Sequence, residues 1–186
     1  GVAQALARGN HKVEIWALEE DVVSSINNEH ENKKFLPGLK LSENISCSSD
    51  IVKVATNKDF LIIASPSLYL ASTISKIKDV PNIVDGSTVI VALTKGFVPS
   101  DQGPKLVLET IENNLSPFYK DCTVYVAGPS HAEEVAMGKL TGLVAASYNP
   151  RNAIRVRELL TVPGLIVFSS FDVVGVQICA AAKNVI

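Results

Sequence analysis

The sequence has 186 residues, of which 47% are hydrophobic and 19% are charged, and its formal net charge is −2. This length is enough for one substantial core, because single domains run to about 100–200 residues. Near-neutral charge with interspersed signs does not indicate binding to nucleic acid or to an anionic membrane, because both partners favour clustered Lys and Arg. We therefore expect neither partner.

Cysteine usage and the chain ends exclude further classes of protein. The sequence has three cysteines, Cys47, Cys122 and Cys179, and no CxxC motif. An odd count without this motif predicts neither a disulfide framework nor a metal site. Each cysteine is predicted to be a small buried residue in a reducing compartment. No apolar run approaches the roughly 20 residues that span a bilayer, and the start lacks the order of a signal peptide. Because the sequence does not begin with methionine, we expect a segment of a longer protein.

The first part of the chain alternates between helix and strand. VAQALAR (2–8) is helical in composition, and HKVEIWA (11–17) predicts a strand. EDVVSSINNEH (20–30) has acidic residues at its start and apolar residues at helical spacing, so it predicts a helix. NKKFLPGLKL (32–41) is typical of a Pro-Gly loop. The next expected elements are a strand at 44–48 and a short helix at 50–56.

Three apolar runs follow, DFLIIAS (59–65), STVIVALTKG (87–96) and CTVYVAGPS (122–130). Short apolar runs bounded by turn residues fit strands that are buried on both faces, as in parallel sheets. The other expected elements are helices at 68–78, 103–115, 131–138, 150–161 and 171–186, and weaker strands at 142–147 and 165–169. This alternation predicts an α/β doubly wound, mostly parallel sheet.

Ligands of such sheets bind at the carboxyl ends of the strands, where this chain has SPS, LTKG and AGPS. In AGPSHAEEVA, Ser130 is predicted as a helix N-cap with Glu133 as its capping-box partner. The motif fits a capped helix, and it also fits a helix N-terminus whose free N–H groups hold a polar ligand. His131 is a candidate acid or base, but its place in the first turn favours a surface position.

Two lysines follow apolar segments. Lys95 comes after a buried strand, from which its ammonium group reaches either into the cleft or into solvent. Lys183 ends an apolar helix and shares a helical face with Val173, Val176 and Ala180. A desolvated lysine has a lowered pKa, which suits proton transfer near neutral pH. The alternative is a lysine that extends into solvent from the end of a core helix.

The ordered motifs HENKKFLPG, SPSLYL, LTKG, AGPSHAEEVAMG and DVVGVQICAAAKNVI closely resemble those of the NAD(P)-dependent glycerol-3-phosphate dehydrogenases. The resemblance covers the whole chain and implies an NAD(P)-binding Rossmann domain over residues 1–170. Gly1 resembles the last glycine of the G-x-G-x-x-G turn, so the first strand and two glycines are missing. Residues 171–186 would begin the helix that leads into an all-helical substrate domain, which is absent together with its phosphate-binding Arg.

The same resemblance implies the roles of individual residues. Lys183 would exchange a proton with the carbonyl oxygen of dihydroxyacetone phosphate or the 2-hydroxyl of glycerol 3-phosphate, while the cofactor exchanges hydride with the same carbon. Lys95 would act beside it and contact both substrate and cofactor. The remaining substrate-binding residues implied are Gly128, Ser130 and Asn184.

The implied cofactor is NAD, with NADP as the alternative. Many bacterial members have an Arg after the second strand, where this chain has Leu18 and Glu19. A carboxylate there favours a ribose hydroxyl and repels a 2′-phosphate. Glu134 matches a family carboxylate with a structural role. The full set of cofactor-binding residues implied is Gly1, Leu18, Glu19, Pro66, Tyr69, Lys95 and Ala132.

The resemblance implies a cytoplasmic homodimer that links glycolysis to glycerolipid and phospholipid synthesis, or to cytosolic redox balance. An organelle address is the alternative to the cytoplasm. One alternative is another β-hydroxyacid dehydrogenase. Those enzymes place an Asn four residues after the catalytic lysine, whereas Asn184 directly follows Lys183. A second alternative is a regulatory module that binds NAD without catalysis, which the paired lysines argue against.

Overall fold

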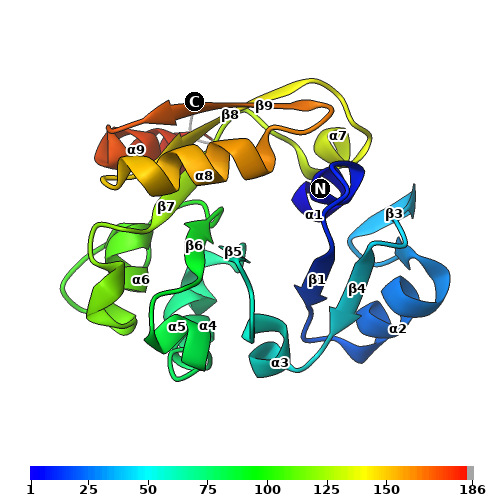
Figure 1. Cartoon of the computed structure of the whole chain (residues 1–186), viewed down its shortest axis with the longest axis horizontal. Coiled ribbons are helices and arrows are strands. Elements are labelled where there is room, and N and C mark those ends of the chain that lie inside the picture. The colour runs from blue at the N-terminus through cyan, green and yellow to red at the C-terminus, as the bar shows by residue number, and fades with distance from the viewer. Residues whose placement is uncertain (184–186) are drawn as a thin grey trace. The chain divides into compact units, whose positions relative to one another are not determined.

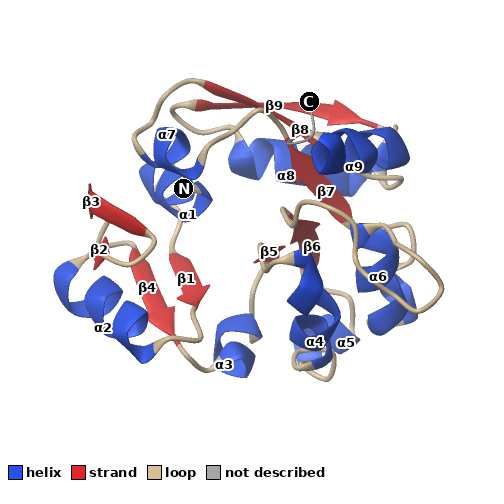
Figure 2. Ribbon diagram, turned by 180° about the vertical axis from the view of Figure 1, so that it is seen from behind, coloured by secondary structure: helices blue, strands red, loops and turns tan. Residues whose placement is uncertain are grey.

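The computed structural model describes residues 1–183, and helices alternate with strands along the chain (Figures 1 and 2). The chain forms two compact units. Unit 1 comprises Gly1–Val54, Ser130–Gly142 and Leu159–Ile166. Unit 2 comprises Ala55–Pro129, Leu143–Glu158 and the described part of Val167–Ile186.

Unit 1 is built on two parallel strands, β1 (Val13–Trp16) and β4 (Ile45–Ser48). Helices α1 (Val2–Arg8) and α2 (Glu20–Glu29) form where the sequence predicts them. A third helix, α7 (Ala132–Ala136), contacts α1. The buried residues of this core are Ala7, Val22, Ile26, Leu36, Leu41, Ile45, Cys47 and Ala136.

The predicted loop at 32–41 is wrong, because this segment forms a hairpin. Strand β2 (Glu31–Asn32) pairs antiparallel with β3 (Leu36–Lys40). The Pro-Gly pair inside β3 obscured the strand pattern. Proline is tolerated here because each strand of a two-stranded sheet is an edge strand, and Gly38 adopts a φ of 76°. Leu36 and Leu41 fasten the hairpin to the core of unit 1.

The sheet of unit 2 has the strand order β5-β6-β7-β8-β9. Strands β5 (Phe60–Ile63), β6 (Val89–Ala92) and β7 (Val124–Ala127) are parallel, as the three apolar runs predict. Every residue of β6 and β7 is buried. Strand β8 (Thr141–Ala146) pairs antiparallel with β7, and β9 (Leu165–Ser170) completes the order. The sheet is therefore mostly parallel and Rossmann-like.

The remaining helical segments follow the expected order, with two additions, α5 (Pro81–Val84) and η2 (Pro117–Tyr119). Helix α5 (Pro81–Val84) was not predicted, because four residues are too few to show a helical period. Its Asn82 donates hydrogen bonds to the Ala55 carbonyl oxygen (3.0 Å) and to Thr88 Oγ1 (2.6 Å). The others are α3 (Ile51–Ala55), η1 (Ser67–Tyr69), α4 (Leu70–Ser75), α6 (Val107–Asn114), η2 (Pro117–Tyr119), α8 (Pro150–Leu160) and α9 (Val173–Ala182).

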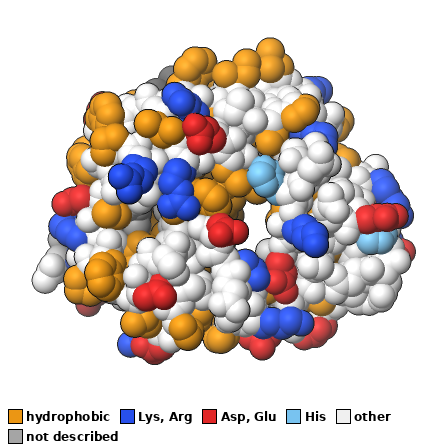
Figure 3. All heavy atoms as spheres, viewed as in Figure 1, with side chains coloured by type: hydrophobic (Ala, Val, Ile, Leu, Met, Phe, Trp, Pro, Cys, Tyr) orange, Lys and Arg blue, Asp and Glu red, His pale blue; other side chains and the backbone are white. Residues whose placement is uncertain are grey.

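The surface carries interspersed charges on the face drawn in Figure 3, where Lys and Arg side chains alternate with Asp and Glu.

All three cysteines are free; Cys47 is buried, Cys122 is half-buried and Cys179 is exposed. The prediction of burial is therefore wrong for Cys179, because α9 buries only one side of its apolar surface. Within residues 1–183, no helix combines the length and apolar character that crossing a membrane requires. The same residues contain no group of three metal-binding side chains arranged around a site.

Candidate active site

The loop that follows β6 is fixed by hydrogen bonds within unit 2. Thr94 is 2% exposed, and its hydroxyl donates to the Ser65 carbonyl oxygen at 2.8 Å. The Thr94 carbonyl oxygen accepts a hydrogen bond from the Tyr125 hydroxyl at 2.9 Å. Gly96 has a φ of 92°, so the chain turns immediately after Lys95. These contacts define where the Lys95 backbone lies.

The same loop lies beside the segment that follows β5. A Cβ added to Gly96 would lie 3.8 Å from Ser67 Oγ, in ordinary contact distance. Ser67 begins η1, which directly follows Pro66 and ends at Tyr69. Pro66 and Tyr69 are both exposed. The carboxyl ends of β5 and β6 therefore present Pro66, Tyr69 and Lys95 in one part of unit 2, as expected for parallel strands.

Lys183 directly follows α9, which packs against β7. Of the face predicted to be buried, Val173 is buried, while Val176, Ala180 and Lys183 are half-buried. The structure therefore confirms that Lys183 follows the more buried side of the helix. Ile178, on the other side of α9, is exposed.

Lys95 and Lys183 interact within unit 2. Burial holds the pKa of the Lys95 ammonium below its ordinary value of 10.5, and the neighbouring Lys183 lowers this pKa further through its charge and a hydrogen bond. Like charges that share a site disfavour the charged form of either group. The structure thus brings together the two lysines that the sequence singled out, in an arrangement suited to giving and taking a proton.

Gln177 is a polar residue of this region that sequence reasoning missed. Its Oε1 accepts a hydrogen bond from the Leu108 backbone N–H at 3.0 Å, and its Nε2 donates to the Val173 carbonyl oxygen at 3.0 Å. Gln177 is 3% exposed and joins α9 to the start of α6. The sequence feature that could have identified Gln177 is its polar side chain within an otherwise apolar helix.

Gly1 and Ala132 meet in unit 1. A Cβ added to Gly1 would lie 2.8 Å from the Ala132 carbonyl oxygen, so no side chain fits without a shift of the backbone. At the other end of α1, Arg8 donates to the carbonyl oxygens of Val135 (2.8 Å) and Ala136 (2.7 Å). Helices α1 and α7 therefore lie side by side in the same direction, and two predicted cofactor-binding residues touch.

Leu18 and Glu19 occupy the turn between β1 and α2 in unit 1. Leu18 is 71% exposed, which leaves an apolar surface available to a ligand. Glu19 precedes the first residue of α2 and pairs with Lys34, with 3.3 Å between Oε1 and Nζ. This turn presents one apolar and one anionic group, as the sequence predicts.

The predicted capping box is wrong. Helix α7 begins at Ala132, so its N-cap is His131, which makes no side-chain capping hydrogen bond. His131 has an extended backbone and is exposed, as predicted. Ser130 lies one residue before the cap and is half-buried. Glu134 forms a surface ion pair with Lys139 at 3.1 Å, in keeping with a structural role.

Two predicted substrate residues remain. Gly128 is half-buried and directly follows β7. Asn184 lies outside the described residues.

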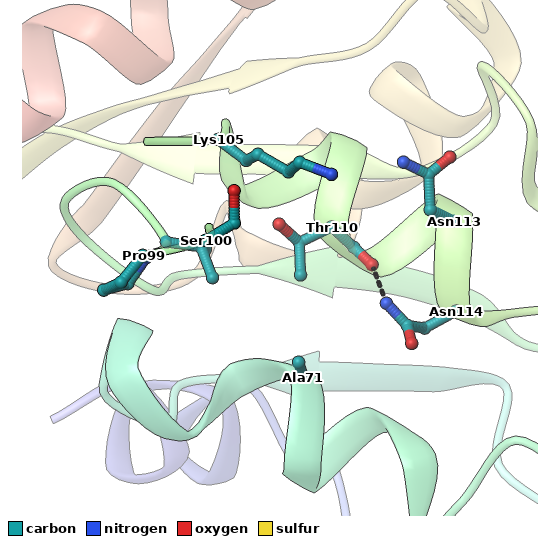
Figure 4. A pocket seen from close by; sticks show the side chains of 8 residues that line it. Ala71, Pro99, Ser100, Lys105, Thr110, Asn113 and Asn114 are labelled. Atoms are coloured by element: carbon teal, nitrogen blue, oxygen red, sulfur yellow. Dashed lines mark hydrogen bonds between the residues drawn. The ribbon is translucent and has the colours of Figure 1, made fainter. Parts of the chain in front are cut away.

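A pocket of about 170 Å³ lies in unit 2, but no predicted site residue lines it (Figure 4). Most of its polar side chains bond to nearby backbone: Ser100 donates to Gly103 (2.5 Å), Thr110 to Leu106 (3.1 Å) and Asn114 to Thr110 (2.8 Å). Its lining residues are Ala71, Val98, Pro99, Ser100, Lys105, Thr110, Asn113 and Asn114. We therefore place the candidate active site at the two lysines.

Comparison with known proteins identifies the family of the chain. Residues 1–153 match the family model described as NAD-dependent glycerol-3-phosphate dehydrogenase N-terminus. The chain belongs to this family. An NAD(P)+ glycerol-3-phosphate dehydrogenase of Treponema denticola is 48% identical over 191 residues, which span 100% of this chain and 54% of that protein.

Solved glycerol-3-phosphate dehydrogenases share the fold. The structure from Plasmodium falciparum superposes with a TM-score of 0.88 at 26% identity, over 99% of this chain and 52% of that one. The structure from Coxiella burnetii gives 0.86 at 27% identity, over 99% and 54%. The chain thus spans about half the length of its curated relatives and corresponds to the N-terminal part of the glycerol-3-phosphate dehydrogenase family.

Proposed function

We propose that this chain forms the NAD(P)-binding half of an enzyme that interconverts dihydroxyacetone phosphate and glycerol 3-phosphate. The observation that carries the proposal is the proximity of Lys95 and Lys183. Burial first, and then the neighbouring Lys183, hold the pKa of Lys95 below its ordinary value. Membership of the glycerol-3-phosphate dehydrogenase family supplies the substrate class. The functional protein would have about the length of its relatives.

In the proposed reaction, Lys183 gives its proton to the substrate carbonyl oxygen during reduction and takes it back during oxidation. A positioned general acid or base of this kind is worth about 10²–10⁴-fold in rate. Lys95, the neighbour of Lys183, is proposed to stabilise the developing oxygen charge and to contact substrate and cofactor. Gly128, Ser130 and Asn184 are proposed to line the substrate.

The residues present fit a dinucleotide. Gly1 packs so closely against the Ala132 carbonyl oxygen that no side chain fits, which is the close packing required of the last glycine in a dinucleotide-binding turn. In unit 2, Ser65 Oγ is buried and has no hydrogen-bond partner among residues 1–183, so it can bond to a bound polar group. When bound, NAD(P)H supplies the hydride. The residues proposed to hold it are Gly1, Leu18, Glu19 and Ala132 in unit 1, and Pro66, Tyr69 and Lys95 in unit 2.

We propose NAD as the preferred cofactor. The exposed Leu18 side chain offers an apolar surface to the adenine, and the Glu19 carboxylate suits a ribose hydroxyl. A 2′-phosphate near this carboxylate would be repelled. NADP would therefore bind more weakly.

The proposed domain organisation has a dinucleotide-binding domain at residues 1–170 and a helix from 171 that leads into the substrate domain. It is supported by the share of the relatives that the chain covers, about half. We also propose that the full-length protein works as a homodimer in the cytoplasm.

The test is NADH oxidation by the full-length protein after addition of dihydroxyacetone phosphate, followed by the absorbance of NADH and repeated with NADPH. Rapid oxidation that is faster with NADH supports both reaction and cofactor. A folded protein that binds NADH but does not oxidise it with this substrate would contradict the proposal. Turnover of a β-hydroxyacid instead would favour that related group, and NADH binding with no turnover would favour a regulatory module.

A further inference from the structure

Two buried tyrosines donate hydrogen bonds at opposite ends of strand β6. The Tyr119 hydroxyl donates to the Thr88 carbonyl oxygen (3.0 Å), just before β6 begins. The Tyr125 hydroxyl donates to the Thr94 carbonyl oxygen (2.9 Å), just after β6 ends. Tyr119 is 3% exposed and Tyr125 is 0% exposed. Burial raises the pKa of each to about 12, so both hydroxyls keep their protons at neutral pH.

The two bonds differ in what they hold. Thr88 lies in a structural network, because its own hydroxyl donates to the Lys58 carbonyl oxygen at 2.6 Å and accepts from Asn82. None of these residues belongs to the candidate active site. Thr94, in contrast, directly precedes Lys95, so its peptide fixes the start of the Lys95 backbone.

Strand β7 connects both lysines. Tyr125 belongs to β7 and pairs with Ala92 at the end of β6. Helix α9, which is followed by Lys183, packs against the same strand. The position of Lys95 relative to Lys183 is therefore set through one rigid strand and the hydroxyl that projects from it.

A second bond closes the arrangement from the side of β5. The Thr94 hydroxyl donates to the Ser65 carbonyl oxygen at 2.8 Å. The Thr94 residue is thus held at its carbonyl by β7 and at its side chain by the end of β5. Both partners are backbone or buried groups, so little freedom remains where the chain enters Lys95.

We propose that Tyr125 is a positioning residue for the dehydrogenase reaction, which holds Lys95 against Lys183 through the Thr94 carbonyl group. Tyr125 acts through Thr94 and touches neither substrate nor cofactor in this role. The inference rests on the proposed function for its catalytic consequence. Its structural part, the effect of Tyr125 on Lys95, can be measured without activity.

The test compares Tyr125→Phe with Tyr119→Phe, because each removes one buried hydroxyl that donates to a carbonyl next to β6. The first measurement is the titration of Lys95 by 13C NMR in lysine-labelled protein, with Lys95→Arg to assign the signal. Tyr125→Phe should move the Lys95 pKa up towards its ordinary value, because the loop is released from Lys183. Tyr119→Phe should leave it unchanged. Equal effects of the two variants, or none from Tyr125→Phe, would overturn the proposal.

The second measurement is turnover in the full-length protein. Tyr125→Phe should lower kcat about 10- to 100-fold with little change in KM, as expected when a catalytic group is displaced by about an ångström. Tyr119→Phe should keep kcat within about twofold of the parent value, because the hydrogen bond that it removes contributes to stability and not to the candidate active site. The two measurements can fail separately. If Tyr125→Phe shifts the pKa of Lys95 but the full-length wild-type protein has no dehydrogenase activity, the proposed function is wrong and the positioning role stands.

Thr94 provides a second route if Tyr125→Phe does not fold. Thr94→Val removes the hydroxyl that donates to Ser65, whereas Thr94→Ser keeps it. Thr94→Val should raise the pKa of Lys95, as Tyr125→Phe does. Thr94→Ser should leave this pKa at the wild-type value. A Lys95 titration that is identical in both Thr94 variants and wild type would contradict the proposal.

Discussion

The turns that follow β1 and β6 both end parallel strands, yet they are held in opposite ways. After β1, Leu18 is 71% exposed and Glu19 is held by a surface ion pair with Lys34. After β6, Thr94 is 2% exposed and is fixed by one buried and one partly buried hydrogen bond. The first turn belongs to unit 1 and the second to unit 2.

The difference suits the two turns to different proposed roles, cofactor preference after β1 and proton transfer after β6. A surface turn can change its side chains at little cost in stability, so the cofactor preference that we propose for Leu18 and Glu19 would be adjustable. Proton transfer requires a catalytic group placed to within a fraction of an ångström, and the hydrogen bonds of Thr94 would provide this for the proposed role of Lys95. We therefore expect substitutions at the β1 turn to change which cofactor is used, and substitutions at the β6 turn to change the rate.

The largest expected effect is at the lysine pair. Lys183→Ala removes the proposed general acid and base, so kcat should fall by about 10²–10⁴-fold in the full-length enzyme. Lys105→Ala is the matched control, because Lys105 is also on unit 2 but lines the pocket of Figure 4. Unchanged turnover in Lys183→Ala would remove this lysine from the mechanism.

Cofactor preference should respond next. Leu18→Arg combined with Glu19→Ser replaces a repulsive carboxylate with a partner for a 2′-phosphate. The ratio of kcat/KM for NADPH to that for NADH should rise about 10- to 100-fold, the worth of a charge-assisted hydrogen bond of about 1.5–3 kcal/mol. Lys34→Gln serves as the control that frees Glu19 without removing it. A ratio that does not move would contradict the role of the β1 turn.

Stability should show the same contrast between the turns. Thr94→Val removes the donor of a partly buried hydrogen bond to the Ser65 carbonyl oxygen, and the free energy of unfolding should fall by about 0.5–1.5 kcal/mol. Lys34→Gln breaks an exposed ion pair and should cost about 1 kcal/mol or less. Urea denaturation of the two variants measures both values. Equal losses would mean that the β6 turn is no more tightly held than the β1 turn.

The smallest effect is the pH dependence of stability. A lysine with a lowered folded-state pKa binds fewer protons in the folded state than in the unfolded state, so its contribution to stability rises with pH up to its ordinary value of 10.5. Lys95→Met removes that contribution. The stability advantage of the Met variant should therefore be largest near neutral pH and shrink as pH approaches 10.5. An advantage that is constant with pH would contradict the lowered pKa.

Local pattern predicted most of the fold but little of the bonding that positions the site. Apolar runs identified β5, β6 and β7, because strands buried on both faces exclude polar residues. The β2–β3 hairpin was missed, because Pro37 and Gly38 are turn residues and only the tertiary packing of Leu36 makes them part of a strand.

The site divides in the same way. The motifs identified Lys95 and Lys183, and the structure brought them together. No local pattern indicates that Tyr125 bonds to Thr94 or Gln177 to Leu108, because each bond joins residues that are distant in the chain. The predicted N-cap of α7, Ser130, was wrong by one residue, because the helix begins after His131.

The most direct test of this account is whether Lys95 and Lys183 form one electrostatic site. The measurement is the titration of Lys95 by 13C NMR in the wild-type chain and in Lys183→Ala. Removal of the neighbouring ammonium should raise the pKa of Lys95, because one cause of its lowering is lost. A pKa of Lys95 that is the same in both proteins would contradict the pairing on which the proposed mechanism rests.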